Sequence, residues 1–169
     1  MDKKGENRMD VSRVNQLGAV MKIGASNNVA YVLTADGKLY ESNSYGAGWQ
    51  RLSGNVANFE PCSSGCVWVT GDGGIGSEFG ISLPANWTVQ QDGSAQPDVE
   101  VSAVASDGNN LVVHCADDTL YLVSGGTVAP LDKNGAVSCL YVINDQIVVE
   151  LEDGSRMVLQ DGKLQQAAL

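Results

Sequence analysis

Short apolar runs alternate with turns rich in glycine, asparagine and aspartate along most of the chain. This pattern predicts strands joined by tight turns rather than helices. The clearest apolar runs are VAYVLT, CVWVTG, LVVHCA and IVVELE. Each run leads into a turn that contains aspartate, and these turns read ADGKLY, GDGGIG, ADDTLY and EDGSRM. We therefore expect an all-β chain built from successive hairpins.

The hairpins recur at regular intervals. The turn aspartates Asp36, Asp72, Asp117 and Asp153 are spaced by 36, 45 and 36 residues. A second apolar run lies upstream of each hairpin and keeps the same intervals. Its repeating positions are Val20, Val56, Val101 and Val137 and, three residues later, Ile23, Phe59, Val104 and Leu140. Because strand and turn positions agree in phase, the chain contains a fourfold internal repeat.

Each repeat unit predicts four antiparallel strands, and such a unit cannot bury both of its faces alone. Four strands in a period of about 40 residues are typical of a propeller blade. We predict an all-β, four-bladed β-propeller-like disk of four-stranded antiparallel blades over residues 18–169. The blades cover about 18–53, 54–92, 99–134 and 135–169. Half of an eight-bladed ring completed by a dimer, and a β-sandwich, are the alternatives.

Residues 1–17 are expected to form an N-terminal extension. Its run VSRVNQL is a candidate for the strand that closes the ring, and the C-terminal run KLQQAAL competes for the same place. Closing the ring with either strand would remove an exposed sheet edge.

The stretch SNSYGAGW, residues 42–49, lies between the third and fourth strands of the first unit. With Ser42, Gly46 and Trp49 it resembles the Asp-box, or BNR, repeat S-x-D-x-G-x-x-W. That repeat belongs to the propellers of sialidases, sortilin-type receptors and photosystem II stability factor-like proteins. Ser44 stands where the family has aspartate.

In the second unit, Ser82 and Trp87 match Ser44 and Trp49, and the last two units have neither tryptophan. In the families that it resembles, the box is structural: a polar side chain caps turn amides and the tryptophan packs between sheets. The resemblance implies the same structural role here, since a tryptophan supplies a large packing area.

Catalysis is not expected. Sialidases use an arginine cluster, and the arginines of this chain, Arg8, Arg13, Arg51 and Arg156, do not suggest one. The sequence has no nucleophile elbow, phosphate-binding loop or histidine-rich metal motif. We predict no enzyme activity, no catalytic residue and no cofactor.

The cysteines are predicted to be buried, reduced thiols rather than metal ligands. Cys62 and Cys66 are too widely spaced for a zinc knuckle, and no matching second pair follows. His114 and Cys115 are neighbours on a strand, so they should face opposite sides of a sheet. Cys139 lies 24 residues after Cys115 in the sequence. A local Cys62–Cys66 disulfide is the alternative in an oxidising compartment.

Ten basic and twenty acidic residues give a net charge of −10. A chain this acidic repels phosphate backbones and anionic membranes, so neither nucleic acid nor membrane is an expected partner. No apolar segment approaches the roughly 20 residues of a membrane span, and the N-terminal residues have no apolar signal-peptide core. We expect a cytoplasmic protein or one assembled into a particle.

A radial arrangement of blades would bring the aspartate turns and the connections between blades to one face. This acidic face is the candidate binding site for a protein with a basic surface, or for a cation. The turns and connections contribute Asp36, Asp72, Asp117, Asp118, Glu152, Asp153, Asp92, Asp98 and Asp132. The competing interpretation is that aspartate–glycine pairs are simply favourable hairpin turns.

The sequence favours a non-catalytic protein-interaction module or structural subunit of a larger assembly, a viral particle included, with homo-oligomers among the expected forms. A carbohydrate-binding propeller that stacks sugars on Trp68 and Trp87 is the first rival. A degenerate glycoside hydrolase is the second.

Overall fold

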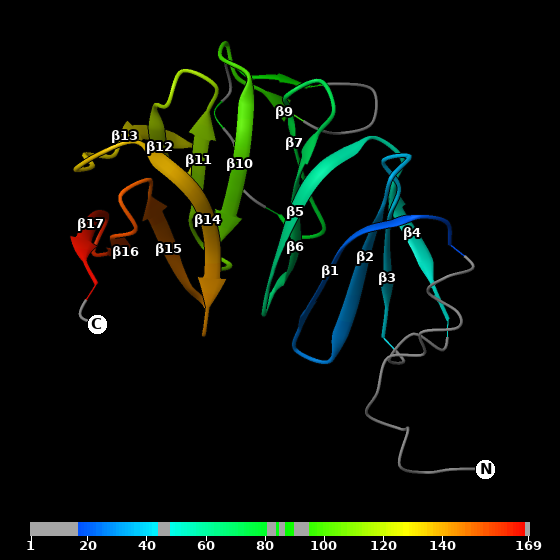
Figure 1. Ribbon diagram of the computed structural model, residues 1–169. Coiled ribbons are helices and arrows are strands. Elements are labelled where there is room, and N and C mark those ends of the chain that lie inside the picture. Colours follow the sequence, from blue (N-terminus) through cyan, green and yellow to red (C-terminus); the bar gives the residue numbers. More distant parts are fainter. Residues whose placement is uncertain (1–16, 44–47, 81–83, 85–86, 90–94, 168–169) are drawn as a thin grey trace. The chain divides into compact units, whose positions relative to one another are not determined.

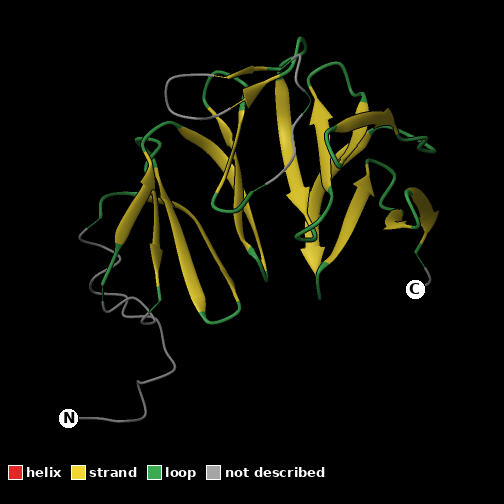
Figure 2. Cartoon of the chain, turned by 180° about the vertical axis from the view of Figure 1, so that it is seen from behind, coloured by secondary structure: helices red, strands yellow, loops and turns green. Residues whose placement is uncertain are grey.

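The computed structural model describes residues 17–43, 48–80, 84, 87–89 and 95–167. Every regular element in these residues is a β-strand, and every strand pairing is antiparallel (Figures 1 and 2). The described part of the chain holds no helix of the length and hydropathy that a membrane span requires. The chain forms two compact units, residues 1–57 and 58–169. The predicted all-β fold of antiparallel sheets is confirmed.

The first unit is a four-stranded meander in which each strand pairs with the next along the chain. Its strands are β1 (Val20–Ser26), β2 (Val29–Thr34), β3 (Leu39–Ser42) and β4 (Gln50–Ser53). β2 is buried along almost its whole length, as expected for the apolar run VAYVLT. The β2–β3 hairpin turns at Asp36, where the sequence predicts it.

The second unit contains three sheets. The first strand of these sheets, β5 (Val56–Cys62), begins with the last two residues of the first unit. Two of these sheets are four-stranded meanders. One comprises β10 (Val101–Ser106), β11 (Leu111–Cys115), β12 (Leu120–Ser124) and β13 (Thr127–Pro130). The other comprises β14 (Val137–Ile143), β15 (Gln146–Leu151), β16 (Arg156–Gln160) and β17 (Lys163–Gln166).

The remaining sheet has five strands, where the sequence analysis expected four. It comprises β5 (Val56–Cys62), β6 (Gly65–Thr70), β7 (Ile75–Ser77), β8 (Thr88–Val89) and β9 (Ala95–Gln96), in the order β5-β6-β7-β9-β8. β9 lies between the second and third predicted blades, 54–92 and 99–134. The unit-to-unit interval here is nine residues longer than the other two, and that extra length allows β9 to pair with β7 while β8 lies outside it.

The same turn geometry closes the hairpin after each second strand. In the first unit, the Gly37 amide donates to the Thr34 carbonyl at 3.0 Å and the Thr34 amide donates to the Lys38 carbonyl at 2.9 Å. The turn requires positive φ, which glycine adopts without steric cost. Gly37, Gly73 and Gly154 have φ values of 84°, 85° and 87°, and Asp118 takes the equivalent position with φ 68°.

Two apolar clusters hold the sheets of the second unit together. One joins residues of β6 and β7, such as Val67 and Ile75, to residues of β10 and β11, such as Val104 and Val113. The other joins the opposite face of the β10–β13 sheet to β14, β15 and β16. In Figure 1, β10 and β14 lie side by side. Within the second unit, the five-stranded sheet and the β10–β13 sheet therefore each bury one face against the sheet that follows in the chain.

The C-terminal strand β17 pairs with β16 as the fourth strand of the last sheet. The run KLQQ thus occupies the outer position for which VSRVNQL was the rival. Residues 11–16 of that rival run lie outside the described residues.

Candidate functional site

The aspartates of the repeated turns accept hydrogen bonds from their own hairpins. Thr34 Oγ1 donates to Asp36, and Thr70 Oγ1 donates to Asp72. In the last sheet, Asp153 accepts from the Ser155 amide at 2.9 Å and from Ser155 Oγ at 2.6 Å. These side chains therefore stabilise the turns, as aspartate commonly does.

Their charge is retained. Hydrogen bonds from Thr34, Thr119 and Ser155 lower the pKa of Asp36, Asp117 and Asp153, respectively, below the ordinary value. The carboxylates of Asp36, Asp117 and Asp153 are exposed. They are anionic turn residues at neutral pH that still face solvent.

Asp118 has a larger structural role than its neighbours. Its carboxylate accepts from Lys133 Nζ at 2.7 Å and from the Val137 amide at 3.1 Å, and His114 Nε2 lies 2.9 Å away. The bond from Lys133 is the largest cause that holds the pKa of Asp118 far below its ordinary value. Asp118 thereby ties the hairpin of one sheet to the first strand of the next.

Hydrogen bonds bring the acidic hairpins of the second unit to one end of its sheets. The Val101 amide donates to the Gly73 carbonyl at 3.1 Å, and the Ala116 amide donates to the Glu100 carbonyl at 2.8 Å. We call the acidic residues along this end the acidic ridge. They are Asp72, Glu100, Asp117, Asp118, Glu152 and Asp153. The ridge of the second unit thus joins five of the predicted acidic residues to Glu100, which the sequence analysis did not single out.

Asp36 lies at the β2–β3 turn of the first unit, so it is not part of the acidic ridge, which is defined within the second unit. Asp132 is exposed, and Asp98 is exposed beside the pocket described below. Asp92 lies outside the described residues, as do Ser44, Gly46 and Ser82 of the Asp-box-like stretches.

The remaining Asp-box-like residues differ in environment. Ser42 is buried at the end of β3, Trp49 is partly exposed, and Trp87 is buried in the core of the second unit. Trp49 Nε1 has no hydrogen-bond partner among the described residues. A packing role therefore has direct support at Trp87, whereas the ring of Trp49 is not fully enclosed.

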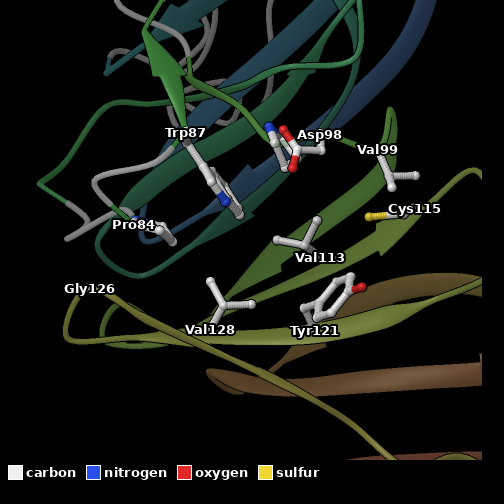
Figure 3. A pocket seen from close by; sticks show the side chains of 10 residues that line it. Pro84, Trp87, Asp98, Val99, Val113, Cys115, Tyr121, Gly126 and Val128 are labelled. Carbon is white, nitrogen blue, oxygen red and sulfur yellow. The ribbon is translucent and has the colours of Figure 1, made fainter.

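A pocket of about 610 Å³ lies in the second unit between the end of the five-stranded sheet and the β10–β13 sheet (Figure 3). One wall comes from the segment around β8 and β9, and the other from β11, β12 and the β12–β13 hairpin. The lining residues are Pro84, Trp87, Pro97, Asp98, Val99, Val113, Cys115, Tyr121, Gly126 and Val128. The walls are thus mainly apolar, aromatic and proline residues.

Two groups decide the chemistry of the pocket. Asp98 is exposed and supplies a carboxylate, and none of the described residues that line the pocket is basic. The Cys115 sulfur points toward the space between the labelled side chains (Figure 3), and burial raises the pKa of this thiol to about 11. At neutral pH the pocket therefore offers apolar contacts and one negative charge, with the thiol protonated.

The pocket and the acidic ridge adjoin each other. Cys115 lines the pocket, and its carbonyl accepts from the Asp118 amide at 3.0 Å in the ridge hairpin. Asp98 lies two residues before Glu100. The pocket and the acidic ridge thus approach each other at the end of β11 and in the segment from Asp98 to Glu100.

The pocket is not among the features predicted from the sequence. Trp87 is predicted there as a structural residue and Asp98 as one of the turn and connection residues, and the intervals of 36, 45 and 36 residues contain the nine-residue excess that supplies one wall. That excess at a single interval of a regular repeat was the available signal, because insertions between repeats often carry function.

The four cysteines are free thiols; Cys62, Cys66 and Cys115 are buried and Cys139 is partly buried. Among the described residues, no group of three or more histidine, cysteine, aspartate or glutamate side chains is arranged to hold a metal ion.

No protein-family model matches the chain, and no curated protein resembles it significantly. Solved structures do. Human WBSCR16 superposes with a TM-score of 0.66 at 13% identity, over 90% of this chain and 54% of that chain. The WD40 β-propeller domain of Doa1 superposes with a TM-score of 0.53 at 16% identity, over 89% and 53%. The fold is that of β-propeller blades.

Two further structures are similar to this chain: one is described together with its binding partners, and the other is of similar length. Prp20p from Saccharomyces cerevisiae, described with its binding properties to Gsp1p and histones, has a TM-score of 0.60 at 10% identity, over 82% of this chain and 44% of that chain. The computationally designed Ika4 protein has a TM-score of 0.56 at 18% identity, over 84% and 91%. The chain thus spans about half of the natural structures named here and most of Ika4.

Proposed function

We propose that the chain is a non-catalytic protein-interaction module that binds an apolar and basic segment of a partner protein. The observation that carries this proposal is the apolar pocket that opens beside Asp98 and the acidic ridge. The pocket would take an apolar side chain of the partner, and the carboxylates would take neighbouring lysine or arginine residues.

The size and lining of the pocket suit an anchor residue. Its volume of about 610 Å³ lies within the range of roughly 300–1,000 Å³ that is usual for ligand pockets. Apolar or aromatic anchors in such pockets commonly carry most of the binding energy of an interface. Val128 at the pocket wall is among the exposed large apolar residues of the described chain, so an anchor would cover apolar surface that now contacts water.

The charge distribution favours a basic partner. The ridge gathers carboxylates at one end of the sheets, and Lys133, which lies beside Asp118, is already paired with it. Complementary charge speeds association and selects partners more than it raises affinity. Because exposed charges are screened by salt, binding should weaken as ionic strength rises.

We propose no catalysis because the side chains in and near the pocket do not provide an activated nucleophile. Thiolate, not thiol, is the reactive nucleophile, and a pKa of about 11 leaves the Cys115 side chain protonated at neutral pH. The only histidine, His114, contacts Asp118, which joins two sheets.

A protein partner also agrees with the structural neighbours. Prp20p binds the proteins Gsp1p and histones. A shared fold is weak support for a shared function, so this likeness supports the class of partner and no particular one.

The carbohydrate-binding alternative has less support. Trp68 is buried and packs against Gly76 across β6 and β7, so it offers no platform for a sugar ring. The structural role of the Asp-box-like stretches stays a prediction, which the burial of Trp87 supports. The proposal that the chain is a subunit of a larger assembly, such as a viral particle, rests only on its being a non-catalytic interaction module.

The proposal can be tested by selecting a displayed library of random peptides on the full chain. We expect enriched peptides to combine an apolar residue with lysine or arginine close by. Val128→Lys should weaken the strongest peptide by about tenfold or more, since a charge would enter the apolar wall. Asp98→Asn should weaken it less and reduce its salt dependence.

Ile23→Lys is the matched control, because it also replaces an exposed apolar residue by lysine but lies in the first unit, outside the pocket. It should bind the peptide like the unmodified protein. Failure to enrich basic and apolar peptides, or binding that tolerates Val128→Lys, would overturn the proposal.

A further inference from the structure

The outer strand of the β10–β13 sheet has one edge without a partner strand. β13 (Thr127–Pro130) is the last strand in the order β10-β11-β12-β13, and all four of its residues are exposed. Among the described residues, no strand pairs with its outer side. An unpaired sheet edge presents main-chain N–H and C=O groups to which an extended segment of another protein can bind.

The hairpin between β12 and β13 decides which main-chain groups face outward. Gly125 and Gly126 have φ values of 58° and 82°, as in a type I′ turn, and Ser124 lies opposite Thr127. In such a turn the Thr127 amide donates to the Ser124 carbonyl. Because hydrogen-bonded and non-hydrogen-bonded pairs alternate in an antiparallel ladder, Thr127 and every second residue after it bond to β12.

This alternation leaves the main chain of Val128 and Pro130 on the open edge. A separate hydrogen bond agrees with it, because the Leu131 amide, four residues after Thr127, donates to the Leu120 carbonyl at 2.8 Å. Proline has no N–H group. The edge therefore offers the N–H and C=O groups of Val128 and the C=O group of Pro130.

Pro130 limits how far this edge can be extended. A proline in an edge strand interrupts the row of donors, and natural proteins use it to prevent sheets from joining edge to edge. Val128 is therefore the β13 position at which a partner residue can both donate and accept a main-chain hydrogen bond. The edge suits a short extended segment of a partner better than the sheet of a second copy.

Val128 also lines the pocket. It lies opposite Val123 of β12, and Tyr121 lies two residues before Val123. By the alternation of side chains, all three share one face of the sheet. Tyr121 and Val128 line the pocket on that face (Figure 3). A partner residue paired with Val128 would place its Cβ on the same face, roughly 5 Å from that of Val128, and thus at the pocket.

We infer that the partner segment binds as an extended strand along β13, with its apolar anchor residue paired to Val128. This inference rests on the proposed function and specifies how the segment lies. The main chain of the anchor residue bonds to the N–H and C=O groups of Val128, and its side chain occupies the pocket. Because every second side chain of a strand lies on the same face, the lysine or arginine that meets Asp98 lies two residues from the anchor.

Amide hydrogen exchange, followed by NMR on the full chain, tests this arrangement. The probe is the strongest peptide selected from the displayed library. In the free protein the Val128 amide should exchange rapidly and the Ala129 amide slowly, because only Ala129 donates within the sheet. A saturating peptide should slow exchange at Val128 about tenfold or more. Exchange at Val128 that stays unchanged would overturn the inference.

Leu164 of β17 is the matched control position. It follows a turn of the same kind, in which Asp161 and Gly162 have φ values of 54° and 77° and Lys163 lies opposite Gln160. Its amide therefore points away from β16, and Leu164 is not among the residues that line the pocket. The peptide should leave exchange at Leu164 unchanged. Equal slowing at both amides would indicate a general reduction of motion and would also overturn the inference.

Peptides that carry one backbone N-methyl group each provide a second measurement. Methylation at the anchor residue removes the donor to the Val128 carbonyl and should weaken binding about tenfold. The same change at a residue next to the anchor, whose main chain points toward solvent, should have little effect. Equal tolerance at the two positions would contradict strand pairing.

The two proposals fail separately. A peptide that shifts the methyl signals of Val99 and Val113 without slowing exchange at Val128 binds the pocket but not the edge. This result would overturn the extended-strand arrangement and leave the proposed function intact. A library that yields no peptide with apolar and basic residues would overturn the proposed function, and the strand arrangement with it.

Discussion

Asp118 occupies the turn position that glycine holds in the other three hairpins. Left-handed backbone conformation costs roughly 1 kcal/mol or more for most residues, and aspartate and asparagine tolerate it best. In return, its carboxylate contacts Lys133, His114 and the Val137 amide. The Asp118 side chain thus accepts the hydrogen bond from the first amide of the next sheet. At Gly37 and Gly73, the backbone carbonyl accepts the equivalent bond.

Asp118→Asn should lower stability most at neutral pH. Asparagine keeps the turn conformation but loses the charge. The folded-state pKa of Asp118 lies far below its ordinary value, so the ionised carboxylate stabilises the fold above about pH 4, and this contribution fades as the pH falls toward the folded pKa. The melting temperatures of the two proteins should therefore approach each other as the pH falls below about 4.

Asp161→Asn provides the comparison, because Asp161 is an exposed turn residue in the same left-handed conformation, with φ 54°. It should melt like the unmodified protein throughout. An Asp118→Asn difference that stays constant with pH would show that the carboxylate's charge contributes nothing.

At the scale of single elements, β6 and β7 pair a large residue with the smallest one. Trp68 lies opposite Gly76, and a Cβ at Gly76 would lie 2.0 Å from Trp68 Nε1 and 2.3 Å from Cε2. The indole therefore lies directly over the glycine backbone. Trp68 is buried. Any side chain larger than hydrogen at position 76 would occupy the space that the indole ring now fills.

Gly76→Ala should destabilise the protein by about 1–3 kcal/mol, the usual cost of overpacking a filled site. Gly80→Ala, where no heavy atom lies within 4 Å of the added Cβ, should cost much less. Chemical denaturation measures both. Combining Gly76→Ala with Trp68→Leu should cost less than the sum of the single changes, and strict additivity would mean that the two residues do not compete for space.

Strand positions were largely readable from the sequence, because burial on one or both faces leaves a local pattern. The run VAYVLT is β2, and the repeated aspartates mark the hairpin turns. The pairing of β8 with β9 was not readable. Each has two residues, and β9 pairs with β7 through Ala95 and Ile75, a contact set by the edge of the sheet and not by local alternation.

At the scale of the whole molecule, the repeat predicted the fold class and the candidate acidic turns. It could not predict the pocket, whose walls come from segments separated in sequence: Trp87 and Asp98 on one side, Tyr121 and Val128 on the other. Nor could it predict that Glu100 joins the acidic ridge, because that follows from the bond between Ala116 and the Glu100 carbonyl. Local patterns specify the strands of each sheet, and contacts between sheets of the second unit create the pocket.

The most direct test of the proposed function is to locate the bound segment by NMR. The strongest selected peptide would be titrated into isotopically labelled protein while the methyl signals of Val99, Val113 and Val128 are followed. We expect these signals to shift with peptide concentration, and the shifts to be absent in Val128→Lys and smaller at high salt. Shifts confined to other parts of the protein, or none at peptide concentrations that saturate binding, would contradict the assignment of the pocket as the partner site.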